Sequence, residues 1–165
     1  MSQSTHEGAH IPVASDIMVR ELVTLSEDTP ILEAMDVLLK HNISGAPVLD
    51  PNGALVGMCS EYDCLRVLAA GQFYSDDHSQ EGVVRDYMTK SFRTANASDD
   101  IYAIAQGFLQ KKVRRLPILQ DGALVGQISR RDVLKAMAAW AKQRAPSRHY
   151  PDYREPGDEV ASRRH

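Results

Sequence analysis

Gly53-Ala54-Leu55-Val56-Gly57 decides the fold of this chain, because the same five residues return as Gly122-Ala123-Leu124-Val125-Gly126. The agreement extends upstream, where Asp16-Ile17-Met18 corresponds to Asp86-Tyr87-Met88. Further pairs follow in the same order, namely Thr24 with Thr94, Pro47 with Pro117, Ser60 with Ser129 and Asp63 with Asp132. A repeat of this length indicates two copies of one folded unit.

The two copies differ in length by a single residue, and the gap falls in a turn. Asp50-Pro51-Asn52-Gly53 in the first copy corresponds to Gln120-Asp121-Gly122 in the second. Asn-Gly and Asp-Gly favour hairpin turns, and turns tolerate changes of length better than strands or helices do. The position of the gap therefore supports the alignment of the two copies.

Each copy predicts the element order β-α-β-β-α. Apolar residues at helical spacing follow Thr29 or Asp99, which we expect to cap a helix, and Pro30 suits a first helical position. Two short strands are expected at 47–49 and 55–59, and at 117–119 and 124–128. A closing helix follows Ser60 or Ser129, and the second of these is expected over 130–144. The fold class is α+β, and pairing the two copies would bury the apolar face that each small sheet exposes.

The bulk composition is that of a soluble protein with no bias toward a polyanionic partner. Hydrophobic residues make up 43% and charged residues 25% of the 165 residues, and the net charge is −3. These values predict no nucleic-acid or membrane partner. The N-terminus shows no signal peptide pattern, and the two cysteines, Cys59 and Cys64, form no disulfide or zinc pattern, so we expect a cytoplasmic protein with two packed thiols. The predicted organisation is a flexible segment at 1–10, domains at 11–70 and 83–144, a linker at 71–82, and a flexible tail at 145–165.

The repeated motifs resemble those of tandem CBS domains, also called a Bateman module. The resemblance covers residues 11–140 and depends on the D-I-M and D-Y-M openings, the strand prolines, and the G-x-x-S-x-x-D signature at 57–63 and again at 126–132. It implies a pseudo-two-fold pair with a cleft that binds AMP, ADP or ATP, with S-adenosylmethionine as a further candidate. It also implies that Asp63 and Asp132 bind ribose, that Ser60 and Ser129 touch phosphate, and that Thr24 and Thr94 line the base pocket.

The chemistry of these residue types agrees with that assignment. An ionised aspartate can accept two hydrogen bonds from a vicinal diol, and a helix start favours a phosphate. Ser-x-x-Asp at a helix start is equally typical of a capping box, and one residue pair can serve both roles. The complete set of candidate ligand-binding residues is Thr24, Gly45, Ala46, Pro47, Ser60, Asp63, Thr94, Arg114, Arg115, Leu116, Pro117, Ser129, Arg131 and Asp132.

Basic residues distinguish the second copy from the first. They precede Leu116-Pro117 and also lie inside the second Ser-x-x-Asp motif, at Lys111, Lys112, Arg114, Arg115, Arg130 and Arg131. Arginine matches phosphate geometry, although a charge run of this kind is also typical of a solvated face. We therefore expect the site of the second copy to take a phosphorylated ligand, and the site of the first copy to take a less charged one or none.

No arrangement of a nucleophile with its base is recognisable, and no P-loop or dinucleotide fingerprint occurs, so the chain is not expected to be an enzyme or to use a catalytic cofactor or metal. The predicted function is a sensor that binds an adenine nucleotide and passes a conformational or oligomeric change to an unidentified regulated protein. A homodimer is expected through the helices at 61–70 and 130–144, which carry Met137 and Trp140. The alternatives are a ligand-independent dimerisation or scaffolding module and, less favoured, nucleic-acid binding through 111–115.

Overall fold

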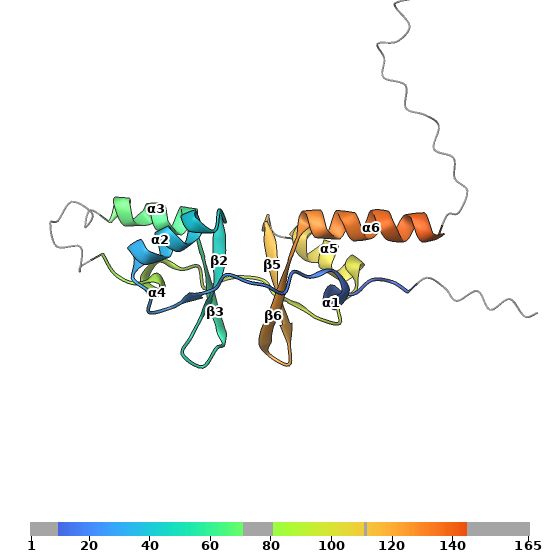
Figure 1. The fold of residues 1–165 in the computed structure, drawn as a ribbon, viewed down its shortest axis with the longest axis horizontal. Coiled ribbons are helices and arrows are strands. Elements are labelled where there is room, and N and C mark those ends of the chain that lie inside the picture. Colours follow the sequence, from blue (N-terminus) through green and yellow to red (C-terminus); the bar gives the residue numbers. More distant parts are fainter. Residues whose placement is uncertain (1–9, 71–80, 111, 145–165) are drawn as a thin grey trace, which may run out of the picture.

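The computed structural model describes residues 10–70, 81–110 and 112–144 of the chain (Figure 1). The flexible terminus, linker and tail expected at 1–10, 71–82 and 145–165 lie outside these residues, apart from 10, 81 and 82. Among the described residues, none of the helices combines the length and the apolar character that crossing a bilayer would require.

The two copies fold alike. The first contains α1 (Ala14–Ile17), β1 (Leu25–Ser26), α2 (Ile31–Lys40), β2 (Gly45–Leu49), β3 (Leu55–Ser60) and α3 (Glu61–Ala69). The second contains α4 (Val84–Tyr87), β4 (Ala95–Asn96), α5 (Ile101–Gln110), β5 (Arg115–Gln120), β6 (Ala123–Ser129) and α6 (Arg130–Arg144). The predicted order β-α-β-β-α is therefore confirmed in both copies, each preceded by one helical turn.

Each copy has a three-stranded sheet with one parallel and one antiparallel pairing. The strand orders are β1-β2-β3 and β4-β5-β6, and the middle strand pairs parallel with the first and antiparallel with the third. Figure 1 shows the two sheets next to each other at the centre of the molecule, with α2 and α3 to one side and α5 and α6 to the other. This arrangement matches the expected pairing of two sheets.

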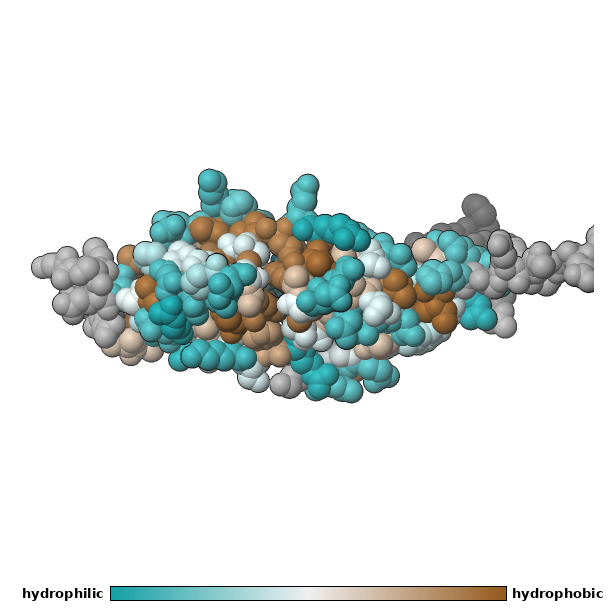
Figure 2. All heavy atoms as spheres, turned by 90° about the horizontal axis from the view of Figure 1, so that it is seen from below, coloured by the Kyte–Doolittle hydropathy of each residue, from teal (hydrophilic) through white to brown (hydrophobic). Residues whose placement is uncertain are grey.

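Amphipathic helices cover these sheets. In α2 the buried side chains are Ile31, Ala34 and Leu38, which recur at helical spacing on one face. They pack in a core with the buried strand residues Ala46 and Val48. In the view of Figure 2, apolar residues gather toward the middle of the molecule and hydrophilic residues surround them.

The hairpin turns explain the one-residue gap between the copies. Asp121 and Gly122 both have positive φ, 50° and 79°, as a two-residue turn with the twist of a hairpin requires. The first hairpin is one residue longer, and the Asp50 carboxylate accepts hydrogen bonds from the N–H groups of Asn52 and Ala54 at 2.8 and 2.9 Å. The side chain of Asp50 thus stabilises a loop that the second copy does not need.

The helix starts differ slightly from the expected ones. Pro30 is the N-cap residue of α2 and not its first helical residue, and the Thr29 side chain does not cap this helix. In the second copy Asp100, and not Asp99, accepts a hydrogen bond from the N–H of Ala103 at 2.9 Å. Capping therefore falls one residue later than expected, because α2 and α5 begin only at residues 31 and 101.

The opening segment of each copy packs against the core of the other copy. Ala14 and Met18 are buried in the core of the second copy, while Val84, Tyr87 and Met88 are buried in the core of the first. Backbone hydrogen bonds hold both opening segments on the opposite copy, among them those between Val19 and Gln127 and between Thr89 and Met58. The two copies are therefore interlocked, and residues that precede β1 and β4 lie against the opposite sheet.

Candidate functional site

A cavity of about 530 Å³ lies between the two copies, and we call it the first cavity. The first copy contributes Ser44 and Gly45, Met58 of β3, and residues 60–63 at the start of α3. The second copy contributes the segment that precedes β4 and the residues on either side of the start of β5, namely Thr89, Ser91, Phe92, Arg93, Lys112, Val113, Arg114, Arg115 and Pro117. A ligand in this cavity would contact both copies at once.

The Ser60-x-x-Asp63 motif lies at the wall of the first cavity and caps α3. The Oδ2 atom of Asp63 accepts hydrogen bonds from the N–H and the hydroxyl of Ser60 at 2.8 and 2.9 Å. The N–H of Asp63 donates to the Ser60 hydroxyl at 3.3 Å, which completes a capping box. The capping interpretation is thus correct for this motif, and it leaves Oδ1 as the oxygen available for further contacts.

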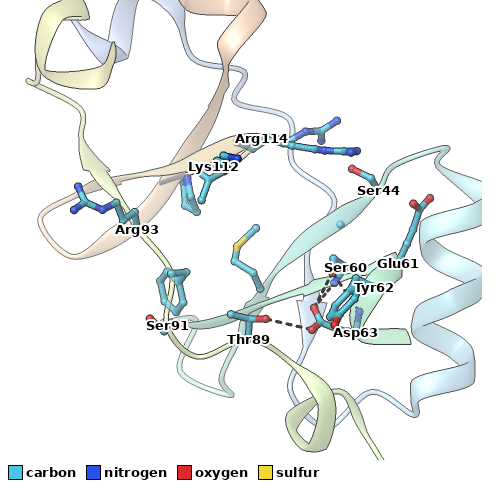
Figure 3. Close-up of a pocket in the computed structure, with 16 residues that line it drawn as sticks. Ser44, Ser60, Glu61, Tyr62, Asp63, Thr89, Ser91, Arg93, Lys112 and Arg114 are labelled. Carbon is cyan, nitrogen blue, oxygen red and sulfur yellow. Dashed lines mark hydrogen bonds between the residues drawn. The ribbon is translucent and has the colours of Figure 1, made fainter. Parts of the chain in front are cut away.

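Thr89 holds the other oxygen of Asp63 from the opposite copy. Its hydroxyl donates to Oδ1 at 3.2 Å (Figure 3). The guanidinium of Arg66 lies 4.0 Å from the same oxygen. Asp63 is only 3% exposed, so a carboxylate at this position needs such donors to remain stable. Hydroxyl donation to Oδ1 is the same interaction that a ligand hydroxyl would make.

Cations outnumber carboxylates around the first cavity. Its lining includes four cationic side chains, Arg93, Lys112, Arg114 and Arg115, against the two carboxylates of Glu61 and Asp63. Figure 3 shows Lys112 and Arg114 across the cavity from Ser60 and Asp63. The cavity therefore combines a carboxylate wall with a cationic wall, and its lining also includes apolar side chains such as Met58 and Phe92.

A second cavity, of about 290 Å³, is related to the first by the internal repeat. It joins Ser129 and Asp132 of the second copy to residues 21–23, Ile43 and Gly45 of the first copy. Its remaining lining residues are Val19, Arg115 and Gln127. Each cavity thus takes its Ser-x-x-Asp motif from one copy and most of its remaining lining from the other.

Asp132 repeats the capping geometry of Asp63 but differs from it at the second carboxylate oxygen. Its Oδ2 accepts from the N–H and the hydroxyl of Ser129 at 2.8 and 2.7 Å. Position 19, which corresponds to Thr89, is a valine and has no hydroxyl to donate. Within the described part of the chain, Oδ1 of Asp132 has no hydrogen-bond donor, and this half-buried carboxylate faces the second cavity.

The crossing of the two copies corrects the expected grouping of the basic residues. Arg114 lines the cavity of Asp63 and not that of Asp132, while Arg115 lines both cavities. Arg130 and Arg131 are exposed and line neither cavity. The expected grouping of the basic residues around the motif of the second copy is therefore wrong for Arg114, because the basic end of β5 faces the motif of the first copy.

The other candidate residues divide into two groups. Gly45 lines both cavities and Pro117 lines the first. The remaining candidates do not line either cavity, since Thr24 and Thr94 are exposed and Ala46, Pro47 and Leu116 are buried within the sheets. In place of the two threonines, the residues just before them line the cavities, at 21–23 and 91–93.

Residues 89–93 and 19–23 were missed because the sequence does not show that these segments cross to the opposite copy. The polar residues of these segments that line a cavity are Thr89, Ser91, Arg93 and Glu21, and none of them has the same residue at the equivalent position of the other copy. Both segments follow the repeated Met18 and Met88, and strict repetition of these methionines is the signal that could have drawn attention to them. Gln127 and Met58, at equivalent positions in the strands, were missed for the same reason.

Two interlocked β-α-β-β-α units that enclose ligand-sized cavities define a tandem-repeat binding module. The chain belongs to the CBS domain family, whose sequence model matches residues 14–70 and 84–139, one match in each copy. The fold, the interlocking and the family assignment agree on a CBS-domain pair.

The chain matches parts of longer proteins. An uncharacterized protein of Methanocaldococcus jannaschii is 30% identical over 76% of this chain, which spans 43% of that protein. Inosine-5'-monophosphate dehydrogenase of the same organism is 28% identical over 82% of this chain, which spans 25% of the enzyme. The chain thus corresponds to less than half of either relative.

Solved structures of similar length share the whole fold. CBSX2 from Arabidopsis thaliana superposes with a TM-score of 0.67 and 28% identity, covering 81% of this chain and 99% of that chain. A crystal structure of CBSX2 in complex with AMP has a TM-score of 0.65 and 30% identity, covering 77% of this chain and 96% of that chain. The resemblance to stand-alone CBS pairs therefore extends over nearly their entire length.

Proposed function

We propose that this protein is a regulatory module that binds an adenosine-containing ligand with a phosphate in the first cavity. The observation that carries the proposal is a cavity of about 530 Å³ whose lining includes both the Asp63 carboxylate and four cations, Arg93, Lys112, Arg114 and Arg115. That volume lies within the range of ordinary small-molecule sites, about 300–1,000 Å³. The AMP complex of the CBSX2 relative supports the choice of an adenine nucleotide.

Each wall of the cavity would bind a different part of the nucleotide. Oδ1 of Asp63 already accepts a hydrogen bond from a hydroxyl, that of Thr89, so a ribose hydroxyl can join or replace it. Arg93, Lys112 and Arg114 would face the phosphate, whose charge they neutralise. Phe92, Val113 and Met58 supply apolar surface for the base.

The regulatory step would follow from the shared lining of the cavity. Ser60 and Asp63 come from the first copy and Arg93 and Arg114 from the second, so a nucleotide would tie the two copies together. The nucleotide would favour the relative arrangement of the copies in which both walls contact it. The size of that shift would be set by the difference between its affinities for the two arrangements. This mode of action requires binding but no chemical step, which is consistent with a module that is not an enzyme.

Isothermal titration of the full chain with AMP and with adenosine tests the proposal. Arg114→Ser places in the cavity the residue found at the equivalent position, Ser44. We expect it to weaken AMP binding tenfold or more, since a hydrogen bond to a charged group is worth roughly 1.5–3 kcal/mol. Adenosine, which lacks the phosphate, should bind the variant and the wild type equally. Arg131→Ser is the matched control, because it removes the same charge from an exposed residue outside the cavity. Equal AMP affinity of the two variants would reject the proposal.

A second candidate function, ligand-independent dimerisation, is favoured by the exposed apolar side chains of the closing helices. Leu65 and Leu68 of α3 are 63% and 47% exposed, and Leu134 and Met137 of α6 are 65% and 42% exposed. Apolar side chains repeated on both closing helices suit an interface between two copies of the chain. Sedimentation of Leu65→Lys/Leu134→Lys, with and without AMP, separates the candidates. A dimer that the variant abolishes and that AMP leaves unchanged would favour scaffolding over sensing.

A further inference from the structure

Cys59 and Cys64 lie on either side of the Ser60-x-x-Asp63 motif, and a hydrogen bond joins their thiols. Both are buried in the core of the first copy, Cys59 at 0% and Cys64 at 8% exposed. Cys59 immediately precedes the N-cap residue of α3, and Cys64 is the fourth residue of that helix. Side chains at these two positions of a capped helix pack against each other and are called a hydrophobic staple.

The second copy shows that the fold requires only apolar side chains at this staple. Its equivalent residues are Ile128 and Val133, which are buried in the core of that copy. The presence of a thiol at both positions of the first copy therefore adds a reactivity that packing does not need. The spacing of the two cysteines predicted only packed thiols, and it is the turn from β3 into α3 that brings them together.

The two thiols are chemically unequal. The hydrogen bond from Cys59 lowers the pKa of the Cys64 thiol, against the opposing effects of burial and of the Asp63 and Glu61 carboxylates, and the same bond raises the pKa of Cys59. Since the thiolate is the nucleophile, Cys64 is the thiol that a small oxidant attacks first. Cys64 is also the more exposed of the two, and Cys59 lies against it as the second thiol of the reaction.

We propose that Cys59 and Cys64 form a reversible redox pair, which a hydroperoxide converts to a disulfide that weakens ligand binding in the first cavity. The Cys64 sulfur attacks one oxygen of hydrogen peroxide, the O–O bond breaks, and a sulfenic acid and a hydroxide form. The Cys59 sulfur then attacks the Cys64 sulfur, the S–S bond forms, and the S–O bond breaks with loss of a second hydroxide. The two thiol protons convert both hydroxides to water, so the two sulfurs lose the two electrons that reduce the peroxide.

The disulfide would change the wall of the first cavity because the loop that it closes contains the motif. All four residues at 60–63 line this cavity (Figure 3). An S–S bond of about 2.0 Å is much shorter than a hydrogen bond between two sulfurs, so its formation draws the end of β3 toward α3. The Asp63 carboxylate, which Ser60 holds at 2.8 and 2.9 Å, moves with this loop. The disulfide depends only on the thiol pair, whereas its effect on AMP rests on the proposed function of the first cavity.

Counting thiols tests the disulfide without any ligand. The chain has two cysteines, so the full chain that has been treated with hydrogen peroxide and then unfolded should have lost both free thiols. It should run as a single chain on a non-reducing gel and give a peptide, containing both cysteines, that is lighter by two hydrogen atoms. Dithiothreitol should restore both thiols. Two thiols that survive the treatment, cysteines that gain oxygen instead, or chains linked to each other would overturn the proposal.

Titration of the oxidised and the reduced protein with AMP tests the consequence. We expect oxidised wild type to bind AMP tenfold or more weakly, as the loss of one hydrogen bond to a charged group predicts, and dithiothreitol to reverse the change. Cys64→Val, which copies Val133 and cannot form the bond, should bind AMP equally before and after peroxide.

This control also separates thiol oxidation from methionine oxidation. Cys64→Val retains Met58 in the first cavity, so an equal loss of affinity in the variant and in wild type would assign the effect to methionine and refute the proposal. Dithiothreitol reduces a disulfide but not methionine sulfoxide. Recovery of wild type therefore decides the same question if the variant does not fold.

These outcomes separate the two proposals. If Arg114→Ser leaves the AMP affinity of the reduced protein unchanged, the proposed function fails, and the thiol count still decides whether the pair is redox-active. If reduced protein binds AMP as expected and the disulfide forms without changing that affinity, only the further inference fails.

Discussion

Gly126→Ala tests the interlocking of the two copies, which builds both cavities. A Cβ atom at position 126 would lie 2.6 Å from the sulfur of Met18 and 2.9 Å from the carbonyl oxygen of Val19. The methionine side chain can move, but the backbone of Val19 is held by two hydrogen bonds. Its N–H donates to the Gln127 carbonyl at 2.9 Å, and its carbonyl accepts from the Gln127 N–H at 3.0 Å. The added methyl group must therefore displace the crossing segment, and overpacking of this kind costs about 1–3 kcal/mol of unfolding free energy.

The equivalent change in the first copy supplies a graded comparison. A Cβ at Gly57 would meet the sulfur of Met88 at 2.6 Å but the Thr89 carbonyl only at 3.2 Å, so Gly57→Ala should cost less than Gly126→Ala. For a chain of this size 1 kcal/mol corresponds to about 2–4 °C in Tm, which thermal and urea unfolding can resolve.

A double-mutant cycle then shows whether the crossing segment is the cause. Met18→Ala removes the sulfur that the new methyl group would strike, so Gly126→Ala should cost less in that background than in wild type. We expect a coupling free energy of about 0.5–3 kcal/mol, the range found for residues in contact. Additive effects of the two substitutions, or a Tm of Gly126→Ala equal to that of wild type, would refute the interlocked arrangement.

Three further predictions concern single residues. Ser129→Ala removes the cap of α6 and should cost about 1 kcal/mol of stability in urea unfolding without ligand, and a variant as stable as wild type would contradict the capping role. Cys59 should not react with a thiol reagent in the folded protein at pH 8, because a hydrogen bond with Cys64 and burial raise the pKa of its thiol and keep it protonated. Rapid labelling of Cys59 before unfolding would show that reading to be wrong. Arg115→Ala should weaken AMP binding about tenfold in 50 mM NaCl and less in 500 mM, since salt screens an exposed cation, and a salt-independent loss would argue against charge neutralisation.

The sequence alone determined the local structure of this protein. Its repeat predicts two β-α-β-β-α units, and the turn residues Asn52-Gly53 and Asp121-Gly122 predict where the copies differ in length. The helix expected over 130–144 begins and ends where α6 does. These features are readable because helix periodicity, capping and turn geometry depend on residues that are close together in the chain.

Only the tertiary structure decided which residues share a cavity. The sequence places Arg114 in the same copy as Asp132, yet the fold brings Arg114 to the cavity of Asp63. The fold likewise brings Thr89 of the second copy to the Asp63 carboxylate. Neighbours along the chain separate in this way because the opening segment and the β5 edge of one copy pack against the other. The contacts form between residues whose distance in sequence carries no periodic signal, so the charge of each cavity could be assigned only once the two copies were seen together.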